Sequence, residues 1–93
     1  MSLGQNDEDR LRSAIEAYHA SALAYAAVKL RLPEKMGARP WSAEALAAEL
    51  GLSPPHLLRF LRGLVTLGIC EERPDGNFAL TSLGQSLKPG SPS

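Results

Sequence analysis

The chain has 93 residues, 44% of them hydrophobic, and its ten Lys and Arg side chains balance ten Asp and Glu side chains. This length fits one domain with a modest core, and the zero net charge lacks the basic excess of most nucleic-acid-binding domains. A single cysteine excludes an intramolecular disulfide, no apolar run is long enough to span a bilayer, and the acidic N-terminus is unlike a signal peptide, so we expect a cytoplasmic protein.

A long alanine-rich helix is predicted over residues 8–32, after a disordered stretch at 1–7, because no glycine or proline interrupts it. Between Ala20 and Val28 the only polar residue is Ser21, so this part of the helix is apolar all round. Such a helix is buried on every side, and a small domain covers only one side. The other side needs a partner, either a second copy of the chain or another domain. The candidate interface residues are Tyr18, Ala22, Leu23, Tyr25, Ala26 and Val28.

Two short helices are predicted next, after an irregular turn at 33–37. The first covers 42–50, with Ser42 as its N-cap and Gly51 as the residue that closes it. The second covers 54–68 and starts at Ser53 and Pro54, since a serine caps well and a proline suits the first turn. Gly68 ends this second helix, because glycine adopts the left-handed conformation of a helix C-terminus without strain.

A β-hairpin follows, with strands over 69–73 and 77–81 around the turn Pro74-Asp75-Gly76. Thr81 then caps a last helix over 82–87, and residues 89–93 have the Pro/Gly/Ser composition of a linker toward a domain that is absent from the chain. The predicted fold is therefore mainly α with a small hairpin. It is a winged helix-turn-helix over 8–88 in which the long N-terminal helix serves for dimerisation.

The helix over 54–68 has a broad apolar face, and His56, Arg59 and Arg62 lie on the opposite face. In one interpretation these basic residues contact DNA, as those of a recognition helix do. In the other they are solvated or form ion pairs. The zero net charge and the carboxylates of Glu71 and Glu72 at the root of the wing favour the second interpretation, because they repel phosphates.

Catalytic chemistry has no recognisable signature in this sequence. It holds no GxGxxG, no P-loop and no HExxH, and its two histidines, His19 and His56, lie far apart. We therefore predict no catalytic, cofactor-binding or metal-binding residue, and we interpret Cys70 as a small buried hydrophobic side chain.

A family resemblance is carried by Leu46-Ala47, Leu50-Gly51, Leu58, Leu61-Arg62, Leu64, Leu67-Gly68-Ile69, Phe78, Leu80-Thr81, Leu83-Gly84 and Leu87. With the AYAAVKLRLPEKMG segment upstream, this pattern over about residues 14–88 resembles the N-terminal dimerisation domain of S-adenosylmethionine-dependent small-molecule O-methyltransferases. The hairpin part, LGI…DGxFxLTxxG, also resembles the winged helices of bacterial regulators.

The resemblance implies a parent enzyme with two domains. The winged domain pairs with another subunit in a homodimer and helps to roof the substrate pocket. Methyl transfer and S-adenosylmethionine binding belong to a Rossmann-like domain that this chain lacks, so the chain itself binds no cofactor. The alternative is a stand-alone winged-helix transcriptional regulator, and the zero net charge favours the dimerisation domain over it.

Overall fold

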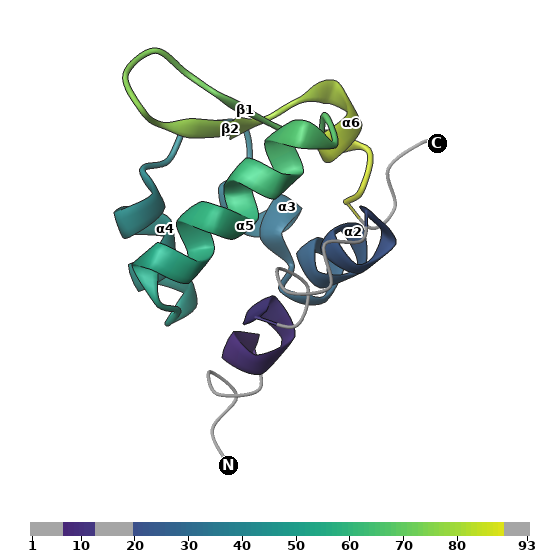
Figure 1. Ribbon diagram of the computed structural model, residues 1–93. Coiled ribbons are helices and arrows are strands. Elements are labelled where there is room, and N and C mark those ends of the chain that lie inside the picture. Colours follow the sequence, from purple (N-terminus) through teal and green to yellow (C-terminus); the bar gives the residue numbers. More distant parts are fainter. Residues whose placement is uncertain (1–6, 13–19, 89–93) are drawn as a thin grey trace.

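The computed structural model describes residues 7–12 and 20–88 (Figure 1). Residues 7–12 are helical, and the elements α2 (Ala20–Lys29), α3 (Leu32–Met36), α4 (Ala43–Leu50), α5 (Pro54–Thr66), β1 (Cys70–Glu72), β2 (Phe78–Leu80) and α6 (Ser82–Gln85) follow. The predicted fold class, mainly α with one antiparallel hairpin, is confirmed. No helix within these described ranges is long and apolar enough to cross a membrane.

A turn at residues 30–31 separates α2 from α3, where the sequence predicted an uninterrupted helix. The helix predicted to reach residue 32 ends at Lys29, and Arg31 adopts a left-handed conformation with φ 56°. The segment predicted as an irregular turn is instead the short helix α3, in which Pro33 occupies the first turn and Gly37 follows the end. Proline fits there because its ring fixes a helical φ and the first turn needs no N–H. It therefore starts a helix here and does not merely stop one.

Helix α4 has the predicted caps. The hydroxyl of Ser42 accepts a hydrogen bond from the Ala45 N–H at 3.0 Å, and Gly51 closes the helix at φ 69°. The N–H of the next residue, Leu52, then donates to the carbonyl of Ala47 at 2.9 Å, which completes a Schellman motif.

Helix α5 begins at Pro54, as predicted, but it lacks the predicted capping bond and ends early. It stops at Thr66, two residues before the predicted end, and Gly68 adopts φ 80° while the Ile69 N–H donates to the Leu64 carbonyl at 2.9 Å. At the start, the hydroxyl of Ser53 makes no capping bond, so that prediction is wrong. An N-cap hydroxyl accepts a hydrogen bond from the N–H of the second or third residue of its helix. The second residue here is Pro55, which has no N–H.

The hairpin pairs Cys70 with Leu80, Glu71 with Ala79 and Glu72 with Phe78. Each strand is three residues long, shorter than predicted, because the turn between Arg73 and Asn77 closes with its own hydrogen bonds. Trp41 adds an isolated antiparallel bridge to Phe78 on the free side of β2. Thr81 caps α6 as predicted, accepting from the Gly84 N–H at 3.2 Å, and α6 ends at Gln85, two residues early.

The core is built around α5, which runs through the middle of the molecule in Figure 1, with α4 on one side and α2 and α3 on the other. Four of its side chains are fully buried: Leu57, Phe60, Leu61 and Leu64. Buried residues of α2, α3, α4 and the hairpin pack into one cluster with them. One face of α2 therefore rests on the core, and this placement decides which α2 residues remain free for another partner.

Candidate dimerisation surface

Helix α2 presents two different faces. Leu23 and Ala26 are only 5% and 1% exposed and belong to the core cluster of their own chain. Tyr25 and Val28 point the other way, with 52% and 45% of their surfaces exposed. Ala22 lies between the two faces and is half-buried. Tyr18, the remaining residue of the predicted interface, falls outside the described residues. The structure thus leaves Tyr25 and Val28 as the apolar side chains of this set that a second molecule can reach.

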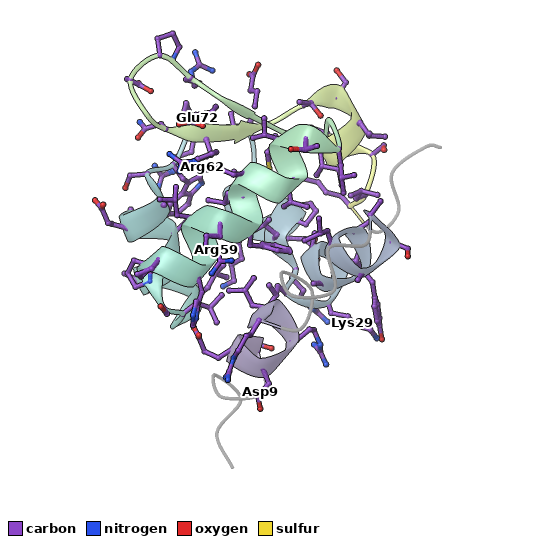
Figure 2. The ribbon with its side chains drawn as sticks, viewed as in Figure 1. Asp9, Lys29, Arg59, Arg62 and Glu72 are labelled. Atoms are coloured by element: carbon purple, nitrogen blue, oxygen red, sulfur yellow. The ribbon has the colours of Figure 1, made fainter. Side chains whose placement is uncertain are left out.

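The outward face of α2, which we define by Tyr25 and Val28, also carries a cation. The Nζ atom of Lys29 lies 5.3 Å from the centroid of the Tyr25 ring, an arrangement suited to a cation–π contact (the Lys29 side chain is labelled in Figure 2). Positions four apart on a helix are neighbours, so the spacing of these two residues could have predicted the pair. Lysine at the last turn also suits the negative end of the helix.

A small apolar cavity of about 120 Å³ lies between α2 and α5. Its lining residues are Ala20, Leu23, Gly63, Thr66 and Leu67. The hydroxyl of Thr66 donates its hydrogen to the Arg62 carbonyl at 3.2 Å, and the other lining side chains are apolar. The sequence analysis did not predict this cavity, because Gly63 lies on the face of the helix opposite the apolar one.

The outer face of α5 holds the three residues of the DNA-binding alternative, and two of them have partners. His56 Nδ1 lies 3.0 Å from Glu8 Oε1, and Arg62 Nε lies 3.9 Å from Glu72 Oε1. Figure 2 shows Arg59 and Arg62 on this face, with Glu72 of the hairpin beside Arg62. Arg59 is exposed and has no ion-pair partner in the described part of the chain. Carboxylates thus occupy two of the three positions, and no observation here favours a nucleic-acid interface.

Cys70 is buried at the start of β1, as predicted, and burial raises the pKa of its thiol to about 12. Because the thiolate is the reactive form, we expect the folded chain to react with iodoacetamide at neutral pH at least about 100-fold more slowly than the chain in denaturant. Mass spectrometry of timed samples would measure both rates. Equal rates in the two conditions would show that the thiol is accessible.

The described ranges contain no group of three His, Cys, Asp or Glu side chains placed to hold a metal ion. The outward face of α2, with its exposed Tyr25 and Val28 side chains, is suited to contact with another protein surface. The fold and this face define a small helical interaction domain.

The chain belongs to the O-methyltransferase dimerisation domain family, whose sequence model matches residues 13–89. Among its relatives, O-demethylpuromycin-O-methyltransferase of Streptomyces alboniger is 36% identical over 87% of the chain, and phenazine O-methyltransferase of Lysobacter antibioticus is 33% identical over 88%. The chain covers only 22% and 24% of those two proteins.

Solved structures of larger proteins contain a domain of similar fold. The structure of N,N-8-amino-8-demethyl-D-riboflavin dimethyltransferase from Streptomyces davawensis is 29% identical, with a TM-score of 0.75 over 99% of this chain and 26% of that one. A second similar structure, described as a pericyclic reaction enzyme, is 28% identical with a TM-score of 0.65 over 71% of the chain and 18% of its own. The chain is thus similar to about a quarter or less of these larger proteins.

Proposed function

We propose that this chain holds two subunits of a methyltransferase together through the outward face of α2. The observation that carries the proposal is the pair of large apolar side chains, Tyr25 and Val28, left uncovered on a helix whose opposite face fills the core. Covering them in a symmetric pair buries apolar surface worth about 25 cal/mol per Å². A two-fold axis brings the same patch of each copy together, so one face suffices for both partners.

The parent protein is proposed to transfer methyl groups from S-adenosylmethionine to a small molecule. Support comes from relatives named as O-methyltransferases and from similar structures that contain S-adenosylmethionine or its demethylated product. In this proposal the cofactor and the chemistry belong to a further domain, and the present chain helps to roof the substrate pocket, as the family resemblance implies. Because a similar domain occurs in a pericyclic reaction enzyme, dimerisation is the function assigned to the chain itself.

Charges placed on the outward face of α2 test the proposal. In the double variant Tyr25→Glu, Val28→Glu, each dimer would have to bury four unpaired carboxylates, and the dissociation constant should rise at least about 100-fold. Sedimentation velocity over a range of concentrations measures the constant. We expect the unmodified chain to sediment as a dimer and the double variant as a monomer with an unchanged circular dichroism spectrum.

Ala48→Glu is the matched control, because Ala48 is an exposed helical residue of α4, on the far side of α5 from α2. This variant should remain dimeric. The proposal fails if the unmodified chain stays monomeric at high concentration, or if the double variant dimerises as tightly as the control.

A further inference from the structure

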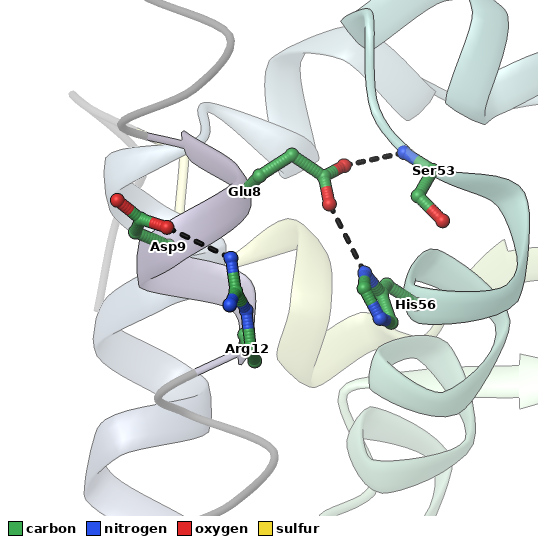
Figure 3. Close-up of polar contacts among 5 residues, drawn as sticks. All are labelled: Glu8, Asp9, Arg12, Ser53 and His56. Carbon is green, nitrogen blue, oxygen red and sulfur yellow. Dashed lines mark hydrogen bonds and ion pairs between the residues drawn. The ribbon is translucent and has the colours of Figure 1, made fainter.

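The short helical segment at residues 7–12, which we call the N-terminal strap, packs onto the domain although it precedes the residues that the family model matches. Leu11 of the strap is fully buried and belongs to the core cluster. Glu8, three residues earlier and therefore on the same side of the helix, reaches the beginning of α5 (Figure 3). The strap is thus part of this chain's fold while lying outside the family domain.

Both carboxylate oxygens of Glu8 bind the beginning of α5. Oε2 accepts a hydrogen bond from the Ser53 N–H, and Oε1 lies 3.0 Å from His56 Nδ1, with the imidazole as donor (Figure 3). Pro54 and Pro55 occupy the first two positions of the helix and have no N–H, so the Ser53 N–H is one of few donors left at this end. A carboxylate is also the favoured charge at the positive end of a helix.

This arrangement is a long-range version of a capping box. In a capping box, a glutamate at the third position of the helix binds the N–H of the N-cap residue. Here the third position is His56, and a glutamate 45 residues upstream of Ser53 takes the N–H of that N-cap residue. The other charged residues of the strap form ion pairs along their own helix, Asp9 with Arg12 at 2.9 Å and Asp7 with Arg10 at 3.9 Å.

We propose that the N-terminal strap is a detachable extension of the dimerisation domain, fastened at the start of α5 by Glu8 and seated in the core by Leu11. Within the described residues, Glu8 is the strap residue whose side chain bonds the body of the domain. When the bonds of Glu8 to Ser53 and His56 break, the strap can dissociate from the domain while α4, α5 and the hairpin keep their own packing. The structural domain of this chain therefore begins upstream of the family boundary.

The charge of Glu8 controls this attachment. Burial by itself would raise the pKa of the Glu8 carboxyl, but the Ser53 hydrogen bond, the bond and charge of His56 and the charge of Arg12 lower it below its ordinary value of 4.5. Arg12 on the strap and His56 on α5 are the charged or titratable groups that face Glu8. A carboxyl whose pKa is lowered by folding stabilises the folded state fully above pH 4.5, and this contribution is lost as the pH falls through the folded pKa.

Trypsin provides the test, because Arg10 and Arg12 lie inside the strap and become cleavable when it detaches. Cleavage tracks the detached population when reattachment is fast. We expect Glu8→Ala to speed cleavage at these two arginines about tenfold at pH 7.5, since a hydrogen bond to a charged group is worth about that factor. Glu8→Gln, which keeps an acceptor but loses the charge, should fall between Glu8→Ala and the unmodified chain. Leu11→Ala should speed cleavage through lost packing alone.

Asp9→Ala and Asp9→Asn are the matched controls, since each removes a carboxylate from the same turn without touching α5. They should leave the cleavage rate within about twofold of the unmodified chain. A second readout is the amide resonance of Ser53 in NMR spectra, which should shift with pH below 4.5 in the unmodified chain and in Asp9→Asn but not in Glu8→Gln.

Two results would overturn the proposal. Glu8 and Asp9 variants that are cleaved at the same rate would show that Glu8 does not hold the strap. Cleavage that begins equally fast at Arg59 and Arg62 of α5 would show that the whole domain opens at once and that the strap has no separate detachment.

Discussion

Replacing Gly84 with alanine should destabilise the folded chain by about 3 kcal/mol, because its methyl group has no room. A Cβ at this position would lie 2.3 Å from the carbonyl oxygen of Ile69 and 2.8 Å from Leu80 Cδ2. That carbonyl cannot easily retreat, since it accepts a hydrogen bond from the Thr81 N–H at 3.0 Å, and the Thr81 hydroxyl bonds the neighbouring Gly68 carbonyl. Urea unfolding followed by circular dichroism would measure the change in free energy.

Gly63→Ala is the matched control for this prediction. Its Cβ would lie 3.1 Å from Leu23 Cδ1, the end of a flexible side chain that borders the cavity between α2 and α5. Leu23 can therefore shift, and alanine inside a helix is favoured over glycine by about 1 kcal/mol. We expect Gly63→Ala to be neutral or to stabilise the chain slightly. Equal losses of stability in both variants would mean that general crowding, and not the Ile69 carbonyl, sets the cost at Gly84.

Ala26→Glu should unfold the single chain, whereas charges at Tyr25 and Val28 should only separate the subunits. Ala26 is 1% exposed within its own core, so a glutamate there must bury an unpaired carboxylate as well as extra volume. The expected cost is about 4 kcal/mol or more, a large share of the stability of a domain of this size. Loss of helical circular dichroism at 25 °C, with Ala48→Glu unchanged, would confirm it. A folded monomeric Ala26→Glu variant would instead place this residue in the subunit interface.

The sequence predicted those elements whose signals are local. Ser42, Gly51 and Thr81 each act within a few residues of their own position and lie at the predicted helix ends, and Gly68 adopts the predicted left-handed conformation just after α5. The turn at Arg31 has no such local signal in the sequence, because arginine has no preference for the left-handed conformation that it adopts there. The left-handed conformation of Arg31, which immediately precedes α3, could be found only from the packing of α2 against α3.

The candidate surface could be predicted only in part. Alanine is compatible with a core, an interface or solvent, so the apolar circumference of α2 did not reveal that Leu23 and Ala26 face inward while Tyr25 and Val28 face outward. The contact of Glu8 with Ser53 could not be predicted from the sequence for a different reason. It joins residues 45 positions apart, and no pattern near either residue points to the other.

The bridge between Trp41 and Phe78 has a consequence for where this domain tolerates a change of length. Trp41 and Phe78 exchange two backbone hydrogen bonds at 2.8 and 2.7 Å, and the indole Nε1 of Trp41 donates to the Met36 carbonyl at 2.9 Å. The start of β2, at the end of the strand pair nearest the turn, is therefore fixed through Trp41 to the end of α3, whereas every residue from 71 to 76 is exposed. Extra residues inserted into the turn between β1 and β2 would extend into solvent. The hydrogen bonds of Trp41 would keep β2 in place, so the packing of the helices would not change.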